Sequence, residues 1–132
     1  MLIKDVPPQD VEEKFAAMPA DVSQVLRRAR LAILGAAKLA DGVGPLTECL
    51  KWGEPSYLTQ SPKTGTTLRL GQIGGCPAVM VPCSTTIIQD ARDRFGELPE
   101  LSGKRGVILG GDAQVVDYVI TAALTYHLRK KA

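Results

Sequence analysis

The sequence predicts a single α+β domain in which helices pack on an antiparallel β-sheet. A length of 132 residues fits one ordinary domain. Apolar residues recur at helical spacing in two long segments, one near each end of the chain. Between them lie short β-type segments whose links are too short for parallel crossovers. We therefore expect about four to five strands, framed by long N-terminal and C-terminal helices.

Residues 1–20 are expected to form an N-terminal arm with a short helix, and residues 21–132 the main α+β domain. Pro8 suits the start of a helix, and the acidic residues that follow it favour the positive end of the helix dipole. A long amphipathic helix is predicted over residues 20–41, because apolar side chains recur there every three or four positions. Gly42 should end it, and residues 45–50 are expected to add one more helical turn.

Strands are predicted over residues 55–60, 66–73 and 77–83, with a Pro/Gly turn at 61–65. The two-residue alternation places Arg69 on the face opposite Leu68 and Leu70. We expect "TTLRLGQIGG" to be an edge strand. Because an exposed edge strand can pair with the same strand of another copy, this segment predicts a homo-oligomer.

A shorter helix should follow, capped by Ser84 or Thr85 and ended by Gly96. Residues 106–110 read as a short buried strand. Asp112 is the expected N-cap of a last helix that continues into "HLRKK", whose cations suit the negative end of its dipole.

Composition narrows the classes of function. A net charge of +2 is too small to predict a nucleic-acid partner, and no apolar run is long enough to predict a membrane span. Cys49, Cys76 and Cys83 form no Cys-x-x-Cys pair, so neither a disulfide framework nor a zinc knuckle is expected. Reduced thiols and the lack of an apolar signal core favour a cytoplasmic protein. No cofactor is assigned.

The series "ECLKWGEPSYLT", "GTTLRLG", "STTIIQDARDRF", "SGKRG" and "ALTYHLRKK" resembles the YdhG-like family, domain of unknown function 1801. The resemblance covers residues 22–131 and implies a compact α+β domain with an antiparallel sheet. It implies no shared activity. A frataxin-like iron-chaperone role has been proposed within the family, and it is carried here as an alternative function. The side chains to test for iron are Asp90, Asp93, Glu97 and His127.

Three polar or aromatic residues raise separate questions. Trp52 is interpreted as a core anchor at a helix-to-strand joint, since tryptophan is highly buried on average; an exposed stacking surface is the alternative. His127 shares a helical stripe with Ala123 and is expected in the core or a pocket wall. Arg69 needs a partner, for which Glu54, Asp90 or a bound anion are the candidates.

The predicted function is a non-enzymatic ligand-binding or protein-interaction module, and no catalytic residue or metal ligand is assigned. An alternative is a small enzyme using His127 or Cys83, a thiol expected near a helix N-terminus. The predicted ligand-binding residues, on a concave face of the sheet, are Trp52, Glu54, Tyr57, Arg69 and His127.

Overall fold

The computed structural model describes residues 7–59 and 63–131, with side chains up to residue 128. The helices are α1 (Gln9–Ala16), α2 (Ala20–Leu39), α3 (Ile87–Phe95), α4 (Ala113–Leu124) and α5 (Tyr126–Lys131). The strands are β1 (Leu46–Lys51), β2 (Glu54–Thr59), β3 (Leu68–Ile73), β4 (Cys76–Met80), β5 (Leu101–Ser102) and β6 (Gly106–Ile108). The predicted N-terminal arm and the predicted 61–65 turn fall partly outside the described residues.

The strands form one antiparallel sheet in the order β1-β2-β3-β4-β6-β5, which confirms the α+β class. The described residues form six strands, where four to five were expected. The prediction of a helical turn at residues 45–50 is wrong, because this segment is β1. It pairs with β2 along its whole length, from Leu46 opposite Thr59 to Lys51 opposite Glu54. The ladder satisfies the backbone groups that a helical turn would leave open.

The predicted edge strand lies inside the sheet. β3 has β2 on one side and β4 on the other, so it offers no free edge for pairing between copies. The alternation predicted along it is correct, since Leu68 and Leu70 are fully buried while Arg69 is only partly buried.

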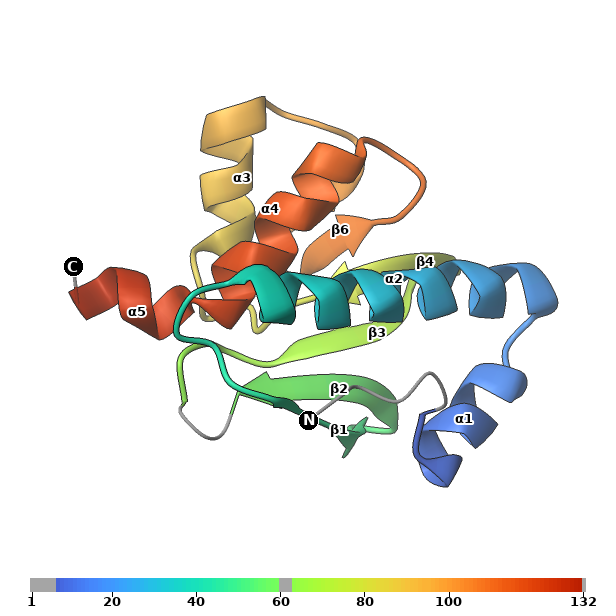
Figure 1. Cartoon of the computed structure of the whole chain (residues 1–132). Helices are drawn as coiled ribbons and strands as arrows, with labels where there is room; N and C mark the ends of the chain where they lie inside the picture. Colours follow the sequence, from blue (N-terminus) through green and yellow to red (C-terminus); the bar gives the residue numbers. More distant parts are fainter. Residues whose placement is uncertain (1–6, 60–62, 132) are drawn as a thin grey trace.

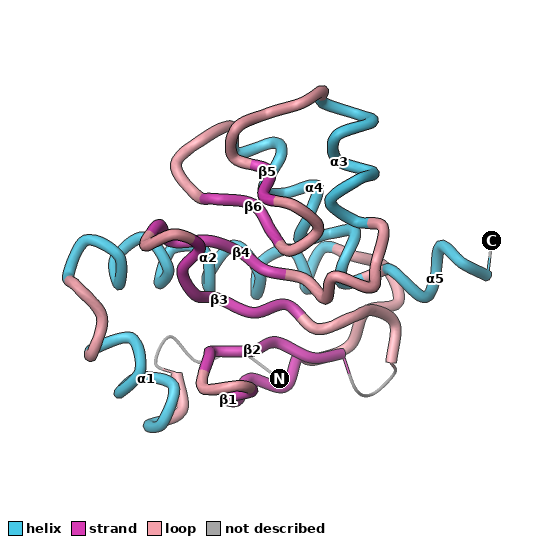
Figure 2. The backbone as a smooth tube through the Cα atoms, turned by 180° about the vertical axis from the view of Figure 1, so that it is seen from behind, coloured by secondary structure: helices cyan, strands magenta, loops and turns pink. Residues whose placement is uncertain are grey.

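The molecule has two layers. Figure 1 shows α2 lying across one face of the sheet, with α4 and α3 continuing the helical layer toward β6, and α1 beside the β1–β2 end. Seen from behind in Figure 2, the strands lie in front of α2. The core fills the space between the layers. Its largest fully buried aliphatic side chains are Leu26, Ile33, Leu68, Leu70, Ile87, Ile88, Ile120 and Leu124. Val11 and Phe15 bring α1 into the same core.

Local chemistry predicted two helix ends correctly, whereas α2 ends at Leu39 with Ala40 as its C-cap, before the stop predicted at Gly42. Gly96 ends α3, and the Asp112 carboxylate accepts a 2.8 Å hydrogen bond from the backbone N–H of Gln114, both as predicted. The predicted caps Ser84 and Thr85 are wrong, since α3 begins at Ile87 and its N-cap is Thr86. The Thr86 hydroxyl instead donates to the carboxylate of Asp90.

The last helix breaks at Thr125 instead of continuing into "HLRKK". In an unbroken helix, the backbone N–H of His127 would donate to the carbonyl of Ala123. Here the N–H of Thr66 donates to that carbonyl at 2.8 Å, and the N–H of His127 donates to the carbonyl of Thr64. The segment at residues 64–66 therefore supplies the hydrogen-bond partners at the end of α4, and α5 starts in a new direction. No helix among the described residues is both long and apolar enough to cross a membrane.

Candidate functional site

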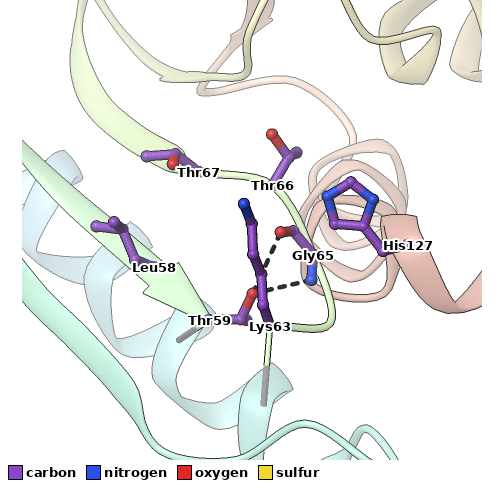
Figure 3. Close-up of a pocket in the computed structure, with 7 residues that line it drawn as sticks. All are labelled: Leu58, Thr59, Lys63, Gly65, Thr66, Thr67 and His127. Carbon is purple, nitrogen blue, oxygen red and sulfur yellow. Dashed lines mark hydrogen bonds between the residues drawn. The ribbon is translucent and has the colours of Figure 1, made fainter. Parts of the chain in front are cut away.

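A polar groove lies where the β2–β3 connection crosses the C-terminal end of α4 (Figure 3). Its volume is about 450 Å³. It joins two parts of the chain that are far apart in sequence, the segment before β3 and the first turn of α5. The groove is lined by Leu58, Thr59, Lys63, Gly65, Thr66, Thr67 and His127.

Hydrogen bonds between threonine side chains and the backbone hold the floor of the groove in place. The Thr59 hydroxyl accepts from the N–H of Gly65 at 2.8 Å and donates to its carbonyl at 3.3 Å. The buried Thr64 hydroxyl donates to the carbonyl of Leu124 at 2.9 Å. At Gly65 a Cβ would collide with the backbone carbonyl of Ala123, so only glycine permits this close crossing. The floor is thus fixed by the fold before any ligand arrives.

Apart from Leu58, the side chains around this floor can donate hydrogen bonds, and the lining contains no acidic residue. Lys63 supplies a cation, His127 an imidazole, and Thr66 and Thr67 hydroxyl groups. In Figure 3 the amine end of Lys63 is directed toward the two threonines, while the His127 ring borders the same space. Within the described part of the chain, no hydrogen bond engages the Lys63 amine or the hydroxyls of Thr66 and Thr67. This donor set suits an anion.

His127 occupies the pocket wall, one of the two positions expected for it. It is half-buried, and its ring meets that of Tyr126 edge-on at a centroid distance of 5.7 Å. The break at Thr125 removes it from the stripe of Ala123, so its place in the groove depends on α5.

Glu54 and Arg69 meet elsewhere, on the face of the sheet turned away from α2. Their charged groups lie 3.7 Å apart, which confirms Glu54 as a partner of Arg69. A Cβ at Gly71 would collide with the Glu54 carboxylate, so the absence of a side chain there leaves room for the pair. Both charged side chains remain about a quarter exposed, and they are not part of the groove lining.

Tyr57 points into the core, toward the helices. It is fully buried, and its hydroxyl donates a 2.8 Å hydrogen bond to Glu48. Burial, reinforced by the Glu48 carboxylate, raises the pKa of the Tyr57 phenol far above its ordinary value. Arg30 completes the cluster, and the hydrogen bonds that it donates to Glu48 raise its own pKa. Tyr57 therefore belongs to a structural cluster that the sequence did not reveal.

The prediction of Trp52 as a core anchor is wrong. Its side chain is 88% exposed, at the tip of the β1–β2 hairpin. Trp52 and Gly53 have φ values of 56° and 73°, the pattern of a two-residue type I′ turn. The chain does reverse direction at Gly53, but the turn joins the two strands β1 and β2 and not a helix to a strand. The ring is consequently carried away from the core.

The acidic residues considered for iron lie on or just after α3, and each has a partner of its own. Thr86 donates to Asp90, Gln89 donates to Asp93, and Arg92 lies 2.9 Å from Glu97. Among the described residues, no three His, Cys, Asp or Glu side chains are grouped closely enough to hold a metal ion. Cys83 is exposed and precedes the first residue of α3 by four positions, outside the groove.

Lys63, Thr66 and Thr67 were missed as candidate site residues. The available signal was the threonine-rich run "KTGTT" with its glycine. This run is far from His127 in the sequence but lies next to it in the fold. The chain matches no protein-family model, no curated protein and no solved structure. Its place in the YdhG-like family stays a prediction.

Proposed function

We propose that this protein is a non-enzymatic binding domain for a small anion, a carboxylate or a phosphate group, held in the groove beside α5. The observation that carries the proposal is the lining itself. It combines Lys63, His127 and threonine hydroxyls and contains no aspartate or glutamate. Donors of this kind, converging without a competing acid, favour a negatively charged ligand.

Because the backbone of the groove is already fixed, binding an anion should lose little conformational entropy. Gly65 and Thr66 are held by Thr59 and by the end of α4, so the threonine donors need little ordering when a ligand arrives. Lys63 is exposed and contributes mainly charge, which water and salt screen. We therefore expect modest affinity that weakens as sodium chloride is added.

Binding fits the groove better than catalysis does. His127 acting as a general base would need a group that orients its ring, and the lining supplies no carboxylate for this. The exposed thiol of Cys83 lies outside the lining, where it cannot attack a bound ligand. The three free cysteines agree with action in the reducing cytoplasm, which forms part of the proposal.

The test is a titration of the ¹⁵N-labelled protein with inorganic phosphate, and separately with malonate, followed by amide chemical shifts. We expect shifts concentrated at residues 63–67 and 127, saturating below about 10 mM. Lys63→Met should weaken binding at least about fivefold, the equivalent of ~1 kcal/mol. Lys104→Met is the matched control, since Lys104 is an exposed lysine in the β5–β6 turn. Equal affinity in the two variants, or shifts spread evenly over the surface, would remove the proposal.

A further inference from the structure

A second surface stands apart from the groove, on the outer side of α2. It is made by Leu31, Ala32, Gly35, Ala36 and Leu39, and is named here the α2 surface. Leu31 is 56% exposed and Leu39 87% exposed, although both are large apolar side chains. Next to them, α2 and α4 enclose a hollow of about 420 Å³. The hollow is lined by Ala32, Gly35, Ala36, Leu39, Ala40, Asp117 and Thr121.

The α2 surface has a near-symmetric pattern about its centre. Leu31, Gly35 and Leu39 follow each other at intervals of four residues, so they lie on one side of the helix. A Cβ at Gly35 would meet nothing within 4 Å, which leaves the middle of the surface low. The two leucines project on either side of that low centre. A surface that carries both the projection and the hollow can complement a copy of itself.

We infer that the occupant of this surface is a second copy of the chain, packed with the two α2 helices antiparallel and crossing near Gly35. In this arrangement Leu39 of each copy enters the hollow beside Ala32 of the other. The absence of a side chain at Gly35 lets the helix backbones approach closely. Both copies bury the same residues, as a two-fold interface requires.

Charge favours a second copy and the antiparallel direction. Arg28 lies seven residues before Gly35, and Asp41 lies six residues after it; both are exposed. α2 ends at Leu39, so Asp41 lies just beyond the C-terminal end of the helix. Antiparallel packing about Gly35 places this end at the level of Arg28 of the other copy, twice by symmetry, and the negative end of the helix dipole adds to the charge of Asp41. Parallel packing would place Arg28 against Arg28. Opposite charges at an interface rim fix orientation in this way.

Sedimentation equilibrium of the full chain over a range of concentrations tests the inference. The mass should rise from one chain toward two below about 0.5 mM. Leu39→Glu should raise the dimer dissociation constant at least about tenfold, because it places a carboxylate in a hollow that Asp117 of the other copy already lines. Since Leu39 is 87% exposed, this variant should fold normally, which far-ultraviolet circular dichroism would verify. Gly35→Arg should act similarly, since arginine is a good helix former and open space surrounds position 35.

A charge exchange distinguishes this interface from any other. Arg28→Glu should weaken the dimer by setting two carboxylates together, and Arg28→Glu combined with Asp41→Arg should restore it to within about threefold of the original. A single-chain mass persisting to about 0.5 mM would overturn the inference. So would a dimer that Leu39→Glu leaves intact, or a double variant no tighter than Arg28→Glu. The groove lies elsewhere, so these outcomes are independent of anion binding.

Discussion

Arg30 of α2 and Glu48 of β1 form a buried two-point ion pair. The Nε of Arg30 donates to one carboxylate oxygen at 2.6 Å, and an Nη donates to the other at 3.0 Å. Their side chains are only 4% and 12% exposed. The Tyr57 hydroxyl donates to the same carboxylate, so one acid joins the long helix to the first two strands. The stability of the fold should therefore depend on all three members of the cluster.

Arg30→Met should lower the free energy of unfolding by about 3–5 kcal/mol, because it leaves the Glu48 carboxylate buried without its cation. Urea unfolding at neutral pH measures this. Arg27→Met is the matched control, since Arg27 lies on the same helix as Arg30 and pairs with Glu12 of α1, but both of these side chains are more than a third exposed. The control should change stability by no more than about 1 kcal/mol.

The double variant Arg30→Met with Glu48→Leu should recover at least half of that loss, because no buried charge then lacks a partner. A single variant that costs less than about 1 kcal/mol would show that water or another side chain takes the place of the guanidinium. A double variant as unstable as Arg30→Met would show that packing, and not charge, sets the cost.

Tyr57→Phe should produce a destabilisation that depends on pH. At neutral pH, loss of the hydrogen bond to Glu48 should cost about 1–2 kcal/mol. The folded-state pKa of Tyr57 is raised by burial, so above about pH 10 only the unfolded chain releases the phenol proton. The unfolded state then binds fewer protons, and this stabilising contribution is lost by up to about 1.4 kcal/mol per pH unit.

Phenylalanine does not titrate, so the difference between wild type and Tyr57→Phe should be constant below about pH 9 and should shrink between about pH 10 and pH 11. Urea unfolding of both proteins across this range gives the difference, in which other alkaline titrations cancel. A difference that stays constant to about pH 11 would mean that Tyr57 ionises equally in both states.

Trp52→Asn should stabilise the protein by about 1 kcal/mol. Trp52 has a positive φ, a conformation that costs a residue other than glycine roughly 1 kcal/mol. Asparagine tolerates this conformation better, and Asn-Gly is a preferred sequence for a type I′ turn. The exposed ring offers little packing to lose. Trp52→Ala is the control, since it removes the ring but keeps the backbone strain. Thermal unfolding of the three proteins decides; a lower melting temperature for Trp52→Asn would show that the ring stabilises the hairpin.

Local patterns in the sequence predicted most of the fold. The periodicity of α2, the alternation around Arg69 and the caps at Asp112 and Gly96 are properties of a few neighbouring residues. The errors arose where contacts between residues far apart in the sequence determine the secondary structure. β1 is a strand because it pairs with β2, and α4 ends early because the 64–66 segment hydrogen-bonds to its last carbonyls. Trp52 was misplaced as a result of the first error.

The candidate site was less accessible to sequence reasoning. His127 was the predicted binding residue that lines the groove, because a lone imidazole is conspicuous in the sequence. The mid-strand Arg69 was conspicuous too, but its pair with Glu54 lies outside the groove lining. Lys63 and Thr66 were missed, since nothing local places the β2–β3 connection against α5. The side of the sheet that Tyr57 faces also depends on the register with β1, which was predicted to be helical.

Gly65→Ala should disturb both stability and the groove. Its added methyl group would collide with the backbone of Ala123 and Leu124, which cannot swing aside, so we expect a loss of about 1–3 kcal/mol. Gly111→Ala is the matched control, because there the nearest atoms to the methyl belong to the flexible side chain of Glu100, and the change should stay within about 0.5 kcal/mol. Amide shifts of the folded variant should change at residues 64–66 and 127, where the chain crosses the end of α4. Equal stability of the two variants would mean that the crossing is looser than its hydrogen bonds indicate.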